Sequence, residues 1–292
     1  MAPGAISNTQ RIEELRSKVP AFYFEFAPPP GRTTDIDHLY VLRDCGKITA
    51  AGQAVFASPY WSLRFVFRDS KGQSPLITVA SPRFGHHIRR QPFHGWVIGA
   101  RSRQPCFPAA AASQPAFKDY AEKLSQAVAE GSPIHRMLDI LDELLDSTHQ
   151  TERSNQRVSG KTVAFFKLSQ AGRNITKLAS MLGQSSRTLQ RRIRASSGFS
   201  PKQMVAVQRF DDAVRTIPAH GARLSHVAGD LHFSDQPHLT REFRRHAGLS
   251  PGAFRDMWQE STVRFVQDHP SVGRLRMAMW VTVGGEKLTA RA

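Results

Sequence analysis

Arginine, glutamine and other hydrogen-bonding side chains gather at two places in this chain, each time on one face of a predicted helix. The first group is Arg187, Gln190, Arg191 and Arg194, and the second is Gln236, His238, Thr240, Arg241 and Arg244. An arginine can donate two hydrogen bonds to O6 and N7 of guanine, and a glutamine can pair with the N6 and N7 edge of adenine. Each such pair discriminates between bases by ~1–3 kcal/mol. These residue types therefore indicate recognition of base edges in double-stranded DNA.

The two groups lie in two copies of one pattern, which begins at Ile175 and again at Leu224. In each copy a short helix with an apolar face precedes a turn and a second, arginine-bearing helix. The inward positions of the second helices are Leu189 and Ile193 in the first copy, and Leu239 and Phe243 in the second. This order is typical of a helix-turn-helix unit, whose second helix enters the major groove.

The residues that begin and end the second helices repeat as well. Ser185 and Asp235 are expected N-caps, because their side-chain oxygens accept an unpaired backbone N–H. Gly198 and Gly248 fit left-handed helix stops. The alternative is that the arginines form a solvated face on an ordinary helical bundle. This is less favoured because the core residues, caps and helix stops agree in both copies.

One helix is predicted between the two copies, over residues 201–217. Ser200-Pro201 suits its start, and its apolar stripe is Met204, Val207, Phe210, Val214 and Ile217. Such a shared helix should hold the two recognition helices at a fixed distance. To contact one side of a duplex they must lie about 34 Å apart, which is one turn of DNA.

The positive charge is concentrated over the same region. The chain has a net charge of +16, and residues 161–256 hold 16 Lys and Arg against 6 Asp and Glu. Such a cluster attracts phosphates and favours a nucleic-acid partner. Charge alone leaves a non-specific architectural DNA-binding protein as an alternative. The glutamine, threonine and histidine on the outward faces argue against it, because phosphate contacts need only Lys and Arg.

Two long motifs carry a family resemblance. Residues 186–192 read SRTLQRR before the stop GFSP at 198–201, and residues 233–245 read FSDQPHLTREFRR before GLSP at 248–251. With these motifs, residues 161–259 resemble the DNA-binding domain of the AraC/XylS family of bacterial transcription regulators. The resemblance implies two helix-turn-helix units that contact adjacent major-groove segments. It places base contacts at Arg187, Gln190, Arg191, Pro237, Thr240 and Arg241.

Two residues depart from the family pattern. Pro237 has no side-chain hydrogen-bond donor. We therefore expect Gln236 or His238 to make the base contact at this point. His232 stands in a turn where the family usually has glycine, so it should need a left-handed backbone, which histidine tolerates better than most residues.

The first half of the chain has a different character. Short apolar runs at 55–56, 61–67, 76–79 and 95–99 alternate with turn signals and predict a small barrel or sandwich. Helices are predicted over 117–130 and 134–145, and the polar stretch 148–160 reads as a linker. We therefore expect an α+β chain with a β-rich N-terminal sensor-like or dimerisation domain (1–115), a helical connector and linker (116–160), an all-α domain with two helix-turn-helix units (161–259) and a C-terminal tail (260–292). The tail could add a strand near 281–285.

The resemblance implies regulation through the N-terminal domain. A small-molecule effector, RNA polymerase and a second copy of the chain are therefore expected partners beside double-stranded DNA. Arg101 and Arg103 are expected at a solvated surface, with contact to an anionic effector as the alternative. The aromatic residues of the domain are expected to be ordinary core, with a ligand pocket as the alternative; they are Trp61, Phe65, Phe67, Phe93 and Trp96.

Enzymatic, metal and membrane functions are not expected. Adjacent strand residues point to opposite faces, so His86 and His87 do not share a metal easily, and no carboxylate at a suitable spacing joins them or His94. Cys45 and Cys106 lack a neighbouring base, although a DNA-repair methyl acceptor that uses one of them is a third alternative. Catalytic residues, metal ligands and cofactors are therefore expected to be absent. The sequence shows no signal-peptide core and no apolar run of about 18 residues, and we expect a cytoplasmic protein with reduced thiols.

Overall fold

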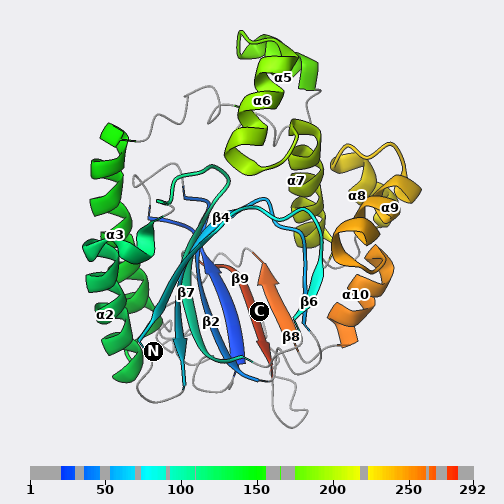
Figure 1. The fold of residues 1–292 in the computed structure, drawn as a ribbon. Coiled ribbons are helices and arrows are strands. Elements are labelled where there is room, and N and C mark those ends of the chain that lie inside the picture. Colours follow the sequence, from blue (N-terminus) through cyan, green and yellow to red (C-terminus); the bar gives the residue numbers. More distant parts are fainter. Residues whose placement is uncertain are drawn as a thin grey trace, which may run out of the picture.

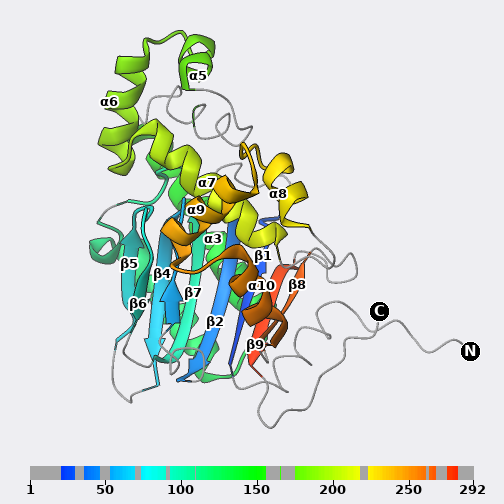
Figure 2. The same cartoon turned by 90° about the vertical axis from the view of Figure 1, so that its right-hand side faces the viewer.

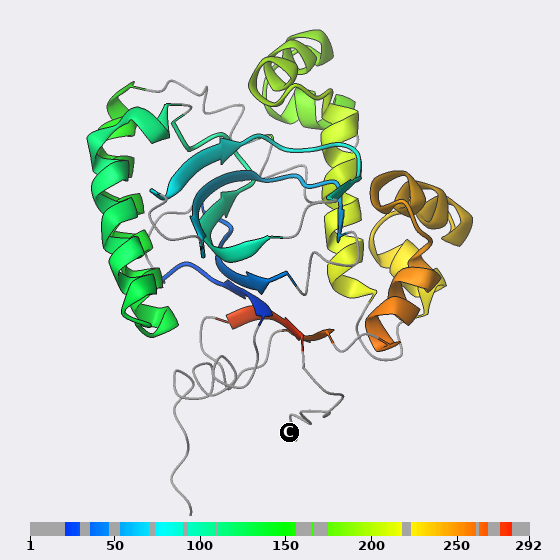
Figure 3. The same cartoon turned by 60° about the horizontal axis from the view of Figure 1, so that its bottom comes forward.

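The structure is a computed structural model that describes residues 21–29, 36–46, 53–69, 74–89, 93–108, 110–155, 165, 175–217, 223–260, 263–267 and 275–281. Its β domain is built on one antiparallel sheet of seven strands in the order β5-β4-β7-β2-β1-β9-β8, in which β8 and β9 follow the helical domain in the sequence. Figure 3 shows that this sheet is strongly curved. The strands are β1 (Ala21–Phe26), β2 (His38–Cys45), β4 (Trp61–Arg68), β5 (Leu76–Ala80), β7 (His94–Ser102), β8 (Val263–Gln267) and β9 (Leu275–Val281), and a separate pair comprises β3 (Gln53–Val55) and β6 (His87–Arg89).

Helices lie on both sides of the sheet, so that the molecule has three layers (Figure 1). The first layer follows the short turn η1 (Ala111–Ser113) and consists of α2 (Pro115–Ala129) and α3 (Ile134–Asn155). Its buried apolar face, which includes Phe117, Leu124 and Leu141, packs in one core with strand residues such as Phe24 and Phe65. The second layer is the helical domain, with α5 (Ile175–Met181), α6 (Ser186–Ser197), α7 (Pro201–Thr216), α8 (Leu224–Asp230), α9 (Gln236–Ala247) and α10 (Pro251–Glu260).

The expected α+β class, with a β-rich first domain and an all-α second domain, is confirmed. Two central strands, β1 and β2, are absent from the predicted runs. In β1, Phe22, Phe24, Glu25 and Phe26 are all buried, so the strand is covered on both faces although it carries a charged residue. Its pairing with β2, in which Phe24 lies opposite Val41, places both strands in the middle of the sheet.

One predicted helix end differs from the structure. The helix was expected over 134–145, yet α3 continues to Asn155, into the stretch predicted as a linker. Residues 148–155 contain no glycine or proline. Adding residues to an existing helix avoids the cost of a new nucleus, so a polar extension without a helix breaker can remain helical. The remainder of the predicted linker, 156–160, lies outside the described residues.

The chain returns to the first domain after the helical domain. Strand β9 pairs antiparallel with β1, with Phe22 opposite Trp280, and β8 pairs with β9. A strand at the chain's end was left open from the sequence, near 281–285; the observed strand ends at Val281, and residues 282–285 lie outside the described part. Over the described residues, no helix has both the length and the apolar character that a membrane crossing requires.

Candidate nucleic-acid interface

The first helix-turn-helix unit consists of α5 and α6. The Ser185 hydroxyl accepts a 3.2 Å hydrogen bond from the Thr188 N–H, so it caps α6 as expected. At the other end Gly198 adopts a left-handed φ of 77°, and its N–H donates to the Arg194 carbonyl at 2.9 Å. Leu189 and Ile193 are buried beneath α6. These contacts determine which face of α6 points outward.

That outward face carries the predicted contact residues of the first unit. Four side chains are exposed along it: Arg187, Gln190, Arg191 and Arg194. Since they share one helix with a fixed start, end and buried side, they form one polar face of α6. Figure 2 shows where α6 lies in the helical domain. Exposed arginine and glutamine donors of this kind are free to meet base edges.

The second unit, α8 and α9, repeats this construction. The Asp235 carboxylate accepts from the His238 N–H and caps α9, and Gly248 ends the helix with a φ of 80°. Pro237 lies in the first turn of α9, where a missing N–H costs little. Leu239 and Phe243 are buried.

The predicted contact residues of α9 are less uniform than those of α6. Gln236, Arg241 and Arg244 are exposed, whereas His238 and Thr240 are half-buried. His238 Nδ1 lies 3.0 Å from Ser234 Oγ, and its ring packs edge-on against Phe233. His238 is therefore already engaged within the protein, while Gln236 is the exposed residue next to Pro237.

The turn of the second unit has the backbone that its sequence predicted. His232 adopts a positive φ of 58°, the same value as Gly183 in the turn of the first unit. Arg209 on α7 donates a 3.0 Å hydrogen bond to the His232 carbonyl, and its guanidinium lies over the Phe233 ring. Because a non-glycine residue in this region is strained, the contact from Arg209 helps to hold the turn.

Helix α7 connects the two units. Ser200 and Gln203 form a capping box at its start, with Pro201 in the first turn. The predicted stripe is buried, fully so at Met204, Val207, Phe210 and Ile217 and partly so at Val214. One continuous helix therefore separates α6 from α9.

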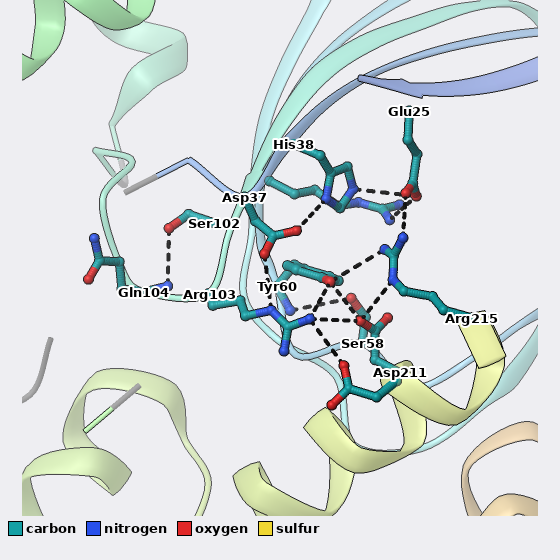
Figure 4. Close-up of polar contacts among 12 residues, drawn as sticks. Glu25, Asp37, His38, Ser58, Tyr60, Ser102, Arg103, Gln104, Asp211 and Arg215 are labelled. Atoms are coloured by element: carbon teal, nitrogen blue, oxygen red, sulfur yellow. Dashed lines mark hydrogen bonds and ion pairs between the residues drawn. The ribbon is translucent and has the colours of Figure 1, made fainter. Parts of the chain in front are cut away.

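The opposite side of α7 faces the sheet domain through a network of charged residues (Figure 4). Arg103, just after β7, lies 3.3 Å from Asp211 and 3.4 Å from Asp212. The Tyr60 hydroxyl donates to Asp211 at 2.6 Å. Arg215 makes a 2.8 Å ion pair with Glu25 of β1. The network thus links α7 to the sheet.

The expectation of a solvated surface for Arg101 and Arg103 was wrong. Arg103 is bound by Asp37, Asp211 and Asp212, and Arg101 lies over the Tyr40 ring near Glu25. Burial lowers the pKa of both guanidiniums, but the surrounding acidic and phenolic groups outweigh it and raise their pKa overall. These arginines are structural partners of buried acids, and the long-range folding that supplies the acids is invisible in the local sequence.

Glu25 is the most deeply buried acid of this network. Burial raises the pKa of its carboxyl group, but the charges of His38, Arg215 and Arg101 together lower the pKa to about 2. Glu25 therefore remains ionised at neutral pH and binds α7 as an anion.

Glu25, Asp211 and Arg215 are not among the functional residues predicted from the sequence. Two signals could have found them. Glu25 is a lone charge within an apolar strand, and a buried charge requires a partner. Asp211 and Arg215 are an (i, i+4) pair of opposite charge on α7, away from its apolar stripe.

The cysteine and histidine candidates are dispersed in the structure. Cys45 ends β2, Cys106 is partly buried against the sheet core, and neither forms a disulfide. Over the described residues, no three His, Cys, Asp or Glu side chains are grouped in a way that could hold a metal ion. His86 lies beside Gly248, and His94 lies beside Gly46.

Comparison with known proteins adds a family match to this geometry. A family model described as a helix-turn-helix domain matches residues 178–257. HTH-type transcriptional regulator RipA of Corynebacterium glutamicum is 38% identical over 81 residues, which cover 28% of this chain and 24% of RipA. The chain therefore spans about a quarter of the length of this curated relative.

Solved structures of other proteins show a limited likeness to this chain. An AraC-type transcriptional regulator from Chromobacterium violaceum has a TM-score of 0.32 and 20% identity, covering 34% of this chain and 91% of the other. ToxT from Vibrio cholerae O395 has a TM-score of 0.38 and 8% identity, covering 82% of this chain and 98% of ToxT. The family match coincides with the two units described above, and residues 178–257 match a helix-turn-helix domain.

Proposed function

We propose that this chain is a sequence-specific transcription regulator, in which α6 and α9 enter two adjacent major-groove segments of one DNA duplex. One observation carries the proposal. Each of these helices has a fixed start, a left-handed glycine end and a buried inner side, and each presents exposed arginines, including Arg191 and Arg241, on the other side. A rigid helix with outward donors suits base recognition.

The β domain is proposed to control DNA affinity in response to a small-molecule effector. Support comes from the network of Glu25, Tyr60, Arg103, Asp211 and Arg215, which connects the sheet directly to α7. A ligand that binds better to one arrangement of the sheet would shift the position of α7, since it can move an equilibrium only through differential affinity. RNA polymerase and a second copy of the chain are further expected partners, and a regulator of chromosomal genes would act in the cytoplasm.

Selection of bound fragments from a bacterial genome, followed by affinity measurement, tests the proposal. We expect one recurring motif, with an affinity at least ~10³-fold above that for a scrambled duplex at the same salt concentration. Repeating the selection with pools of candidate metabolites tests the effector. Uniform binding to all fragments, with only a steep salt dependence, would instead support the non-specific architectural alternative.

A further inference from the structure

Two loops of the β domain lie against the helical domain. Residues 56–60 precede β4, and residues 83–86 follow β5; we call these segments the clamp loops. They are joined by two backbone hydrogen bonds of 2.8 Å, from Ser58 N–H to the Arg83 carbonyl and from Arg83 N–H to the Ser58 carbonyl. This pairing makes the two loops one structural unit.

The clamp loops bind the C-terminal end of α9. The Ala57 N–H donates a 3.1 Å hydrogen bond to the carbonyl of His246, in the last helical turn, where carbonyls have no partner within the helix. In the other direction, His246 Nδ1 lies 2.8 Å from the Phe84 carbonyl. The His246 side chain is fully buried. The end of this recognition helix is therefore held by the β domain.

Glycine at position 248 permits this close approach. A Cβ atom at Gly248 would lie 2.7 Å from Nε2 of His86, in the second clamp loop. Burial lowers the pKa of His246, which favours its neutral form against Phe84. The contact is therefore built from close packing and hydrogen bonds of neutral groups.

Phe84 contacts the ends of both recognition helices. Its ring centroid lies 4.9 Å from that of His246 in α9, and 6.0 Å from that of Phe199, which directly follows the Gly198 stop of α6. The Arg245 guanidinium of α9 lies over the same ring at 4.8 Å. One aromatic side chain of the β domain thus stands between the two units.

We propose that Phe84 is a positioning residue that determines the separation and angle between α6 and α9, and with them the spacing between the two DNA half-sites that the chain accepts. The inference rests on the proposed function. Helix α7 connects the two units along the chain, and Phe84 adds a further contact with the end of each unit, which restricts the bending and twisting that α7 alone would permit. One added base pair between the half-sites rotates one of them about the DNA axis by about a tenth of a turn. If α6 and α9 are held rigidly, they can therefore fit only one spacing well.

Selection from a library of random duplexes tests the inference, with the full chain as wild type and as Phe84→Ala. We expect the wild type to recover two half-motifs at one gap length. Phe84→Ala should recover the same half-motifs over several gap lengths. We also expect an effect on affinity when one base pair is inserted between the half-sites. The wild type should lose about tenfold in affinity, and Phe84→Ala should lose less than about threefold, because a relaxed geometry lowers the cost of a misplaced contact.

Controls separate positioning from general destabilisation. Phe67→Ala removes a buried ring from β4 in the sheet core and should retain the single gap length. Phe84→Leu keeps apolar volume but loses the ring contacts, so it should relax the gap preference to a smaller degree; thermal unfolding monitors folding in all variants. An unchanged single gap in both Phe84 variants would overturn the inference. Absence of any half-motif for the wild type would overturn the proposed function itself, and the inference with it.

Discussion

The turn of the first helix-turn-helix unit contains Gly183 where the second unit has His232, and both residues adopt a φ of 58°. A glycine takes this backbone without strain, whereas a side chain makes it costly by ~1–2 kcal/mol. The second unit is given additional contacts at this place, because Arg209 bonds the His232 carbonyl. The two turns therefore share one backbone conformation, but with different residues and different stabilising contacts.

The two units also differ in how they contact the β domain. Phe56 packs against Phe210 of α7 and Phe254 of α10, whose rings contact Phe243 of α9, and the Ala57 N–H bonds a carbonyl at the end of α9. For the first unit, the ring contact between Phe84 and Phe199 lies at the helix end. The β domain therefore contacts the second unit both at its core and at the end of α9.

The largest effect is expected from the cores of the two units. Phe243→Ala should lower the free energy of unfolding of the helical domain by about 3–5 kcal/mol, because it removes a buried ring in contact with Phe210 and Phe254. Ile193→Ala in the first unit should cost about 2–4 kcal/mol. Urea denaturation followed by circular dichroism measures both. The control is Leu76→Ala, which should change the free energy of unfolding by close to zero because Leu76 is exposed. A smaller loss for Phe243→Ala than for Ile193→Ala would contradict the comparison.

The next largest effect is a pH dependence of folding stability, which arises where the β domain contacts α7. Since the pKa of Glu25 falls from 4.5 to about 2 in the folded chain, this carboxylate stabilises the folded state by about 3 kcal/mol above pH 4.5. That contribution should decline as the pH falls from 4.5 to 2. Glu25→Gln should remove this part of the pH dependence.

Stability of wild type and Glu25→Gln against urea across this pH range measures the effect. The exposed carboxylate variant Glu143→Gln on α3 serves as the matched control, and it should follow the wild type. If Glu25→Gln showed the wild-type pH profile, Glu25 would not be the acid that holds α7 to the sheet.

Moderate effects are expected from the contact residues. Arg191→Ala and Arg241→Ala should each weaken specific DNA binding by ~1–3 kcal/mol while thermal unfolding stays unchanged, because both side chains are exposed. Fluorescence anisotropy with the selected duplex measures the affinity, and exposed Lys118→Ala on α2 is the control for loss of a positive charge. Full affinity in both arginine variants would refute the assigned faces.

The smallest effect is expected from exchanging the turn residues. Gly183→His should destabilise the first unit by ~1 kcal/mol, because Arg209 lies at the other turn. His232→Gly should be close to neutral, since relief of strain is offset by greater freedom of the unfolded chain. If His232→Gly raised the stability by as much as Gly183→His lowers it, as measured by thermal unfolding, Arg209 would give no specific support.

The helical domain followed closely from local sequence. Caps at Ser185 and Asp235, stops at Gly198 and Gly248, and the left-handed turn at His232 all depend on neighbouring residues, and the structure confirms each of them. Whether the outward residues contact DNA stays a prediction.

The β domain was predictable only in class. Strand β1 pairs with β9, from the other end of the chain, and no local pattern encodes such a pairing. The positions of Arg101 and Arg103 depend equally on distant partners, among them Asp211. Physical signals that act over long sequence separations, such as a lone Glu25 in an apolar strand, indicate that a partner exists but not which one.

Methylation interference on the selected duplex tests the central claim most directly, with wild type, Arg191→Ala and Arg241→Ala compared. The wild type should show two groups of critical guanines about one helical turn apart. Each variant should lose one group and retain the other, so that α6 and α9 are assigned to separate segments. Loss of the same group in both variants, or of neither group, would contradict recognition by two outward-facing helices.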